Sequence, residues 1–149
     1  MADEVERVQV TIRPAVTHAD REACFAVRMR VFVEEQAVPE EEELDHHDAD
    51  AAHFVVEVGG EIVGTARVVH LEDGCAKIGR VALLREHRGQ GIGRALMHYA
   101  MAAALRHCDT LVLDAQLPVI GFYERLGFEA EGPVFLDAGI EHRRMWLRR

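Results

Sequence analysis

The segment Arg88-Gly89-Gln90-Gly91-Ile92-Gly93 constrains this chain most, because it places three glycines where a long helix is expected to begin. After Gly91, apolar residues recur every three or four positions as far as His107, which is the spacing of one helix face. The first backbone N–H groups of a helix have no intrahelical acceptor and carry partial positive charge. A glycine loop at that point is therefore a natural cradle for a pyrophosphate.

The composition of this loop argues against two other phosphate-binding loops. The loop has no Lys-Ser/Thr pair, as a Walker loop would, and the following strand lacks the acidic residue that holds ribose in a dinucleotide-binding fold. A nucleotide-binding module is disfavoured on these grounds. Arg88 and Arg94 can add charge-assisted hydrogen bonds to a phosphate. A glycine turn that only packs a helix remains the alternative for the loop taken alone.

Two further helices are expected from apolar residues at helical spacing. The first runs from Thr17 to about Gln36, with Thr17 or Asp20 as its N-terminal cap. The second runs from Val119 to Leu126, between Pro118 and Gly127, which is the usual order of these two residues around a helix.

Alternating or continuous apolar runs predict strands along the rest of the chain. Gly59-Gly60 predicts a hairpin between two of them. Residues 36–50 are rich in Glu, Asp and His without an apolar period, and they are expected to form a surface loop. The expected strands are Val8–Arg13, His53–Val58, Glu61–Val69, Cys75–Leu83, Thr110–Ala115, Phe128–Ala130 and about His142–Leu147.

The length and the net charge of the chain limit the functions that it can have. The 149 residues fit one domain, 1–149, that can bury a sizeable core. A net charge of −9 argues against nucleic-acid binding. The same sign would suit an amine-bearing partner, but the preferred explanation is that the acidity only keeps the protein soluble. No run approaches the ~20 apolar residues of a membrane span, and the acidic start Met1–Glu6 is unlike a secretory signal.

The three cysteines, an odd number, are expected to be reduced and mostly buried. We therefore expect a cytoplasmic protein without membrane contact.

The acidic segment invites a metal-site interpretation at Asp45-His46-His47-Asp48, which we do not favour. Adjacent residues in a loop rarely converge on one ion, so no metal is expected and a solvated loop is preferred. The run Glu40–Glu43 is likewise expected to be solvated, although it could attract a cationic acceptor.

Three motifs together resemble, in order and spacing, the acyl-CoA core of the GNAT N-acetyltransferases. They are Ile78–Leu83, Arg88–Gly93 and Phe122–Phe128. Further segments resemble the ElaA-like branch of this superfamily, and they are Arg30–Gln36, Glu43–Asp45, His53 and Gly139–His142.

This resemblance implies an α/β (α+β) GNAT fold, with a mixed, mostly antiparallel sheet flanked by helices. It implies that the strand before the loop splays from its neighbour, and that its backbone pairs with the pantetheine arm of acetyl-CoA. The implied activity is direct transfer of the acetyl group, in a ternary complex, to a primary amine on a small molecule or peptide. The implied cofactor-binding residues are Val81, Ala82, Leu83, Arg88, Gly89, Gln90, Gly91, Ile92, Gly93 and Arg94.

Acyl transfer to an amine needs a group that receives a proton. A lysine-like amine with a pKa of ~10.4 lies about 4.6 kcal/mol from its neutral form at pH 7. In many GNAT relatives an acid on the central strand serves as the base, but Cys75–Leu83 contains no Asp or Glu. Glu35, His53 and His142 are therefore the candidate bases, directly or through water, and the preferred alternative for each is a hydrogen-bonding role at the surface.

The leaving thiolate of CoA needs a proton donor, and Tyr123 occupies the tyrosine position that GNAT relatives use as a general acid. The alternative is that Tyr123 only packs beside Phe122. The backbone N–H of Val81 or Leu83 could stabilise the charge that develops on the carbonyl oxygen. A non-catalytic acyl-CoA-binding module would keep the glycine loop but need neither base nor acid, and it remains the alternative. A homodimer is left open.

Overall fold

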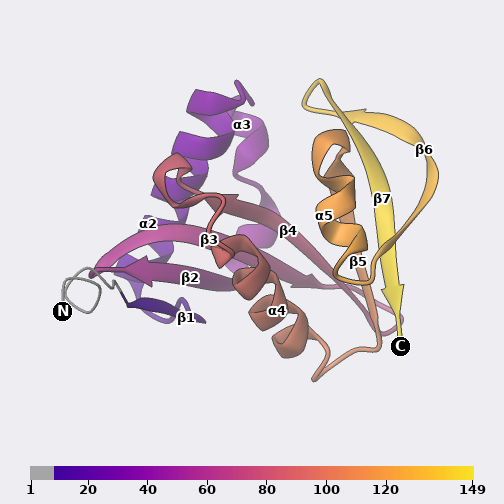
Figure 1. Ribbon diagram of the computed structural model, residues 1–149, viewed down its shortest axis with the longest axis horizontal. Helices are drawn as coiled ribbons and strands as arrows, with labels where there is room; N and C mark the ends of the chain where they lie inside the picture. The colour runs from indigo at the N-terminus through magenta and orange to yellow at the C-terminus, as the bar shows by residue number, and fades with distance from the viewer. Residues whose placement is uncertain (1–8) are drawn as a thin grey trace.

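Seven strands form one sheet in the order β1-β2-β3-β4-β5-β7-β6 in the computed structural model, which describes residues 9–149 (Figure 1). β4 and β5 are parallel, and the other neighbouring pairs are antiparallel. The mixed, mostly antiparallel sheet flanked by helices is thus confirmed. The strands are β1 Val10–Pro14, β2 Ala52–Val58, β3 Glu61–His70, β4 Cys75–Leu83, β5 Thr110–Gln116, β6 Glu129–Asp137 and β7 Ile140–Arg148.

Residues 1–8 lie outside the described part of the chain, and with them the expected strand start at Val8 and the acidic segment Met1–Glu6. The predicted hairpin at Gly59-Gly60 joins β2 to β3. The predicted strand Phe128–Ala130 was too short, because β6 continues to Asp137.

Helices and short helical turns connect the strands. Thr17, one of the two predicted cap residues, caps α2 through a reciprocal pair of hydrogen bonds with Asp20. The helix does not continue as α-helix to Gln36, because it becomes a π-helix at Met29. None of the helices in residues 9–149 is long and apolar enough to cross a membrane. The helical segments are α2 His18–Arg28, η1 Met29–Glu35, α3 Glu40–Glu43, η2 His46–Ala49, η3 Arg85–His87, α4 Ile92–Ala104, η4 Leu117–Val119 and α5 Ile120–Glu124.

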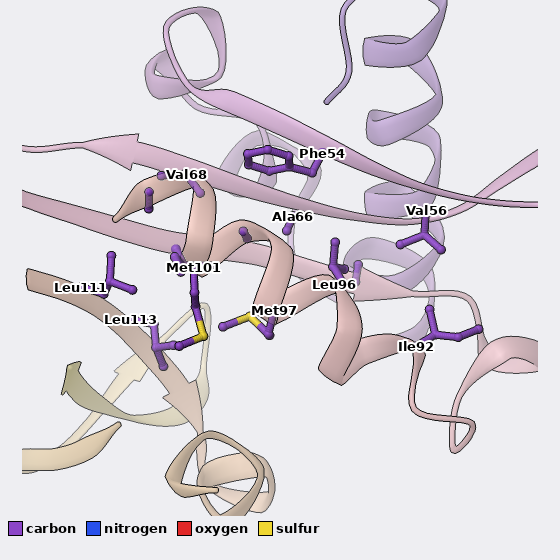
Figure 2. Packing of buried hydrophobic residues seen from close by; sticks show 14 of the residues in the cluster. Phe54, Val56, Ala66, Val68, Ile92, Leu96, Met97, Met101, Leu111 and Leu113 are labelled. Atoms are coloured by element: carbon purple, nitrogen blue, oxygen red, sulfur yellow. The ribbon is translucent and has the colours of Figure 1, made fainter. Parts of the chain in front are cut away.

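Helices cover both faces of the sheet (Figure 1). On one face, Leu96, Met97 and Met101 of α4 point into the space between helix and sheet (Figure 2). On the other face, Cys24 of α2 packs against Val55. Successive strand residues face opposite sides, so β2 serves both layers. The buried side chains that α4 meets include Phe54, Val56, Ala66, Val68, Leu111 and Leu113.

The cysteines only partly match expectation. Cys24 is buried, but Cys75 and Cys108 are half-buried, and all three are free thiols.

The acidic segment 36–50 is not the solvated loop that the sequence predicted. It forms α3 and η2, and three of its carboxylates pair with three arginines from α2, β3 and β4 at N–O distances of 2.6 to 3.3 Å. We call these six side chains the arginine–acid network. Arg28 contacts Glu43 and Asp48, Arg67 contacts Asp45 and Asp48, and Arg80 contacts Glu43 and Asp45.

The arginine–acid network matters for stability because much of it is buried. The side chains of Arg28 and Glu43 are only 1% and 4% exposed. Burial alone would raise the pKa of Asp48, but its hydrogen bonds with Arg28, the Asp45 backbone and Arg67 lower it to about 2. The side chain of Glu43 is therefore structural, whereas Glu40, Glu41 and Glu42 are exposed as expected. Within residues 9–149, no three His, Cys, Asp or Glu side chains form a cluster suited to a metal ion.

Candidate active site

A cavity of about 260 Å³ opens between β4 and β5. The two strands pair only where Cys75–Lys77 lies opposite Thr110–Val112, and beyond these residues they separate. The side of β4 that faces β5 is therefore left without a partner strand from Ile78 onward. Residues from η1, α5 and the turn between β6 and β7 complete the walls of the cavity.

A bulge in β4 shapes this open side of the strand. Arg80 and Val81 together face the single residue Ala66 of β3, because the register shifts between Thr65 and Arg67. Arg80 has a left-handed backbone with φ of 51°, which is unusual for a residue with a side chain. The network holds its guanidinium 3.2 Å from Glu43. The arginine–acid network is thus attached directly to the strand that borders the cavity.

The glycine loop follows β4 and begins α4, as predicted. Gly89 and Gly91 have φ values of 77° and 84°, and a Cβ built at either would meet no atom within 4 Å. Backbone conformation, and not close packing, therefore requires glycine here. Gly91 is the N-terminal cap of α4, and no side chain caps the first turn. The first N–H groups of α4 are thus available to a ligand.

Tyr123 of α5 lines the cavity between β4 and β5. Its ring packs edge to face against Phe122 and Phe128, with centroid distances of 5.0 and 6.3 Å. Burial raises the pKa of Tyr123 to about 12. The hydroxyl therefore stays protonated at neutral pH, and it can donate a hydrogen bond to a group in the cavity.

His142 of β7 lines the same cavity. Its Nδ1 lies 2.7 Å from the carbonyl oxygen of Ile140, which can only accept, so Nδ1 carries the proton in the neutral ring. Nε2 is then an acceptor. The ring stacks on Phe135 at 5.8 Å, which holds its orientation.

Glu35 and His53 lie away from the cavity lining. Glu35 ends η1 and pairs with Arg88 of the glycine loop at 2.9 Å. His53 is buried in β2, where its Nε2 lies 2.9 Å from the Asp48 carbonyl and burial lowers its pKa. Of the four candidate catalytic side chains, the structure brings Tyr123 and His142 to one cavity.

The GNAT family model matches residues 15–128, and these contain β4, the glycine loop, α4 and Tyr123. The chain belongs to the acetyltransferase (GNAT) family. In the GNAT fold of this chain, the cavity lies at the point where the central strands separate.

Several known proteins are similar to most of this chain. The uncharacterized N-acetyltransferase YjcF of Bacillus subtilis is 39% identical over 123 residues, which cover 81% of this chain and 87% of YjcF. An acyl-CoA N-acyltransferase structure from Pseudomonas aeruginosa is 31% identical, covers 95% of this chain and 99% of its own, and superposes with a TM-score of 0.83. Escherichia coli ElaA is 25% identical over 95% of this chain and 100% of its own, with the same TM-score of 0.83.

Two polar features of this cavity were not predicted from the sequence. Asp114 of β5 accepts from Lys77 at 3.0 Å and from Arg144 at 2.9 Å. Burial alone would raise the pKa of Asp114, but these two cations lower it, so the carboxylate is already occupied. Asp114 could have been singled out in the sequence, because it is an isolated acidic residue in an otherwise apolar strand.

The second missed feature is a hydrogen bond between two glutamines. The side chain of Gln116, at the end of β5, donates to Gln36, just after η1, at 2.9 Å. Both residues line the cavity, and they join two of its walls. The residues are 80 positions apart in the chain, so no local pattern could have paired them.

Proposed function

We propose that this GNAT protein transfers the acetyl group of acetyl-CoA directly to a primary amine of a small molecule or peptide. The observation that carries the proposal is the open side of β4, which joins the glycine loop to the cavity containing Tyr123. A GNAT acetyltransferase of Elizabethkingia anophelis with a similar fold, at 14% identity and a TM-score of 0.73, was solved with acetyl-CoA bound. We propose that this chain uses the same molecule, acetyl-CoA, as its acyl donor.

The proposed donor site uses backbone groups for most of its contacts. The pyrophosphate binds the N–H groups of the glycine loop and the first turn of α4, where the helix dipole favours an anion. The pantetheine pairs with the unpartnered side of β4 as an added strand would. The residues proposed for donor binding are Val81, Ala82, Leu83, Arg88, Gly89, Gln90, Gly91, Ile92, Gly93 and Arg94.

Tyr123 is proposed to stabilise the leaving thiolate. With its pKa near 12, complete proton transfer to a thiolate of reference pKa ~8.5 is uphill by about 3.5 units, or about 4.8 kcal/mol. The hydroxyl therefore acts mainly by donating a hydrogen bond to the sulfur as negative charge develops. The N–H groups of Val81 and Leu83 are the proposed donors to the carbonyl oxygen.

His142 is the candidate base that the geometry favours, because its Nε2 is the acceptor nitrogen of a ring that lines the cavity. It would take the proton of the attacking amine, directly or through water. Glu35 and His53 are already engaged with Arg88 and Asp48 respectively.

A thiol-release screen tests the proposal. The acceptors are polyamines, amino acids, aminoglycosides and lysine-bearing peptides, each supplied with acetyl-CoA, and acetyl-CoA and ATP binding are measured by titration calorimetry. We expect acetyl-CoA binding and thiol release with at least one amine. Tight acetyl-CoA binding without turnover on any amine would favour the non-catalytic binding module. Binding of ATP in place of acetyl-CoA would overturn the proposal.

Gly91→Ala is expected to weaken acetyl-CoA binding at least tenfold, or ~1.4 kcal/mol, because a Cβ holds the phosphate away from the backbone donors. Gly60→Ala is a matched control. Gly60 also has φ of 84° and open space around its Cβ position, but it lies in the β2–β3 turn. Both variants should lose a similar ~1–2 kcal/mol of stability from the left-handed backbone. Equal acetyl-CoA affinity in the two folded variants would remove the loop from the donor site.

His142→Asn is expected to lower kcat at least tenfold, since the Asn amide can still donate to the Ile140 carbonyl but offers no counterpart of Nε2. The dissociation constant for acetyl-CoA should stay unchanged. His47→Asn, at an exposed position in η2, is the control and should keep the wild-type rate. A His142→Asn protein with wild-type kcat would assign the base to another group.

A further inference from the structure

A second cavity, of about 340 Å³, lies between the first turn of α4 and α5. Its lining is Arg94 from α4 and Phe122, Arg125 and Leu126 from the α5 region. A Cβ on Gly93 would come 4.0 Å from the Phe122 ring, so this ring rests beside the start of α4. The cavity is therefore next to the proposed pyrophosphate cradle and separate from the cavity that Tyr123 and His142 line.

Two uncompensated positive charges face this second cavity. Within residues 9–149, neither Arg94 nor Arg125 forms an ion pair with a carboxylate. Most of the other arginines have such a partner, and the chain carries a net charge of −9. A Cβ on Gly121 would come 3.8 Å from a terminal nitrogen of Arg125, so this side chain lies back along α5. Two arginines without carboxylate partners at one cavity suit an anionic ligand.

The remaining lining adds an aromatic surface to these charges. Phe122 and Leu126 offer apolar area, and a guanidinium binds phosphate through several N–H groups in one plane. The cavity thus matches a ligand that combines a phosphate with a flat or apolar group. Once its pyrophosphate is at the start of α4, acetyl-CoA has one such unit left, the adenosine with its 3′-phosphate.

We propose that Arg94 and Arg125 bind the 3′-phosphate of the acyl-CoA donor, and that Arg125 makes the protein discriminate CoA from its 3′-dephospho form. This inference rests on the proposed function, because it needs an acyl-CoA donor at the glycine loop. Arg125 is then a specificity residue for the donor, outside the motif that begins α4.

Calorimetric titration of acetyl-CoA and acetyl-3′-dephospho-CoA tests this assignment with the wild type, Arg125→Gln and Arg106→Gln. Arg106 follows the end of α4, is exposed and has no carboxylate partner in the described chain, so its variant changes the net charge equally. We expect the wild type to prefer acetyl-CoA at least tenfold. Arg125→Gln should lose most of this preference while its affinity for the dephospho donor stays constant, and Arg106→Gln should keep it.

The outcomes separate this inference from the proposed function. If the wild type binds neither donor, the proposed function fails, and this inference fails with it. If the wild type binds both donors equally, or if Arg125→Gln weakens both by the same factor, only the 3′-phosphate assignment is overturned. Melting temperatures of all three proteins establish that the variants are folded.

Discussion

Tyr123→Phe is expected to lower kcat by about 10²-fold or more, the scale for losing one hydrogen-bond donor to a developing negative charge, while the affinity for acetyl-CoA changes little. The substitution keeps the ring between Phe122 and Phe128 and removes only the hydroxyl that burial keeps protonated. The measurement is single-turnover kinetics, so that chemistry and not product release sets the rate.

Two controls make this result specific. Tyr99→Phe removes the other tyrosine hydroxyl of the chain, on α4 and outside the lining of the cavity, and should leave kcat unchanged. An acyl donor with a more acidic leaving thiol needs less stabilisation, so it should lose less rate in Tyr123→Phe. A variant with the wild-type rate of chemistry would show that the thiolate leaves without help from Tyr123.

Glu43→Ala is expected to lower the free energy of unfolding by about 3–5 kcal/mol, because it leaves the largely buried network with three arginines and only two carboxylates. Arg28 is 1% exposed and would lose its 2.7 Å contact with Glu43, and Arg80 would lose a contact of 3.2 Å. Urea unfolding followed by circular dichroism measures the change. Glu41→Ala, in the same short helix but exposed, should stay within about 0.5 kcal/mol of the wild type.

A less severe variant keeps this prediction testable if Glu43→Ala does not fold. Asp45 is 29% exposed in its side chain, so Asp45→Ala should destabilise less than Glu43→Ala but more than Glu41→Ala. Equal, small effects in all three would contradict a structural role for the network. Electrostatic steering of a cationic acceptor should accordingly be tested by neutralising Glu40–Glu42 alone, with Glu43 kept.

The elements predicted well from the sequence are those decided by neighbouring residues. The Thr17 cap depends on Asp20, three positions away, and the Gly59-Gly60 turn joins two strands that follow each other in the chain. The start of α4 directly after Gly91 is similarly local. Such features need no knowledge of tertiary contacts.

The acidic segment could not be predicted in this way. Composition cannot tell a solvated carboxylate from one paired with a distant arginine, and Arg80 reaches Glu43 across 37 positions of the chain. The same difficulty affects the candidate bases. The sequence placed Glu35 and His142 on equal terms as candidate bases, but only the tertiary structure brings Glu35 to Arg88, 53 positions away in the chain.

The two sides of the cavity between β4 and β5 differ in how freely they can change during evolution. On one side, Glu42 directly precedes Glu43 of the arginine–acid network, so substitutions that displace Glu43 risk several kcal/mol of stability. On the other, Asp137 and Ala138 lie in a turn between β6 and β7 near the sheet edge (Figure 1), where substitutions disturb few neighbours. Paralogues that have diverged to new acceptors should therefore differ in this turn while retaining the three arginines.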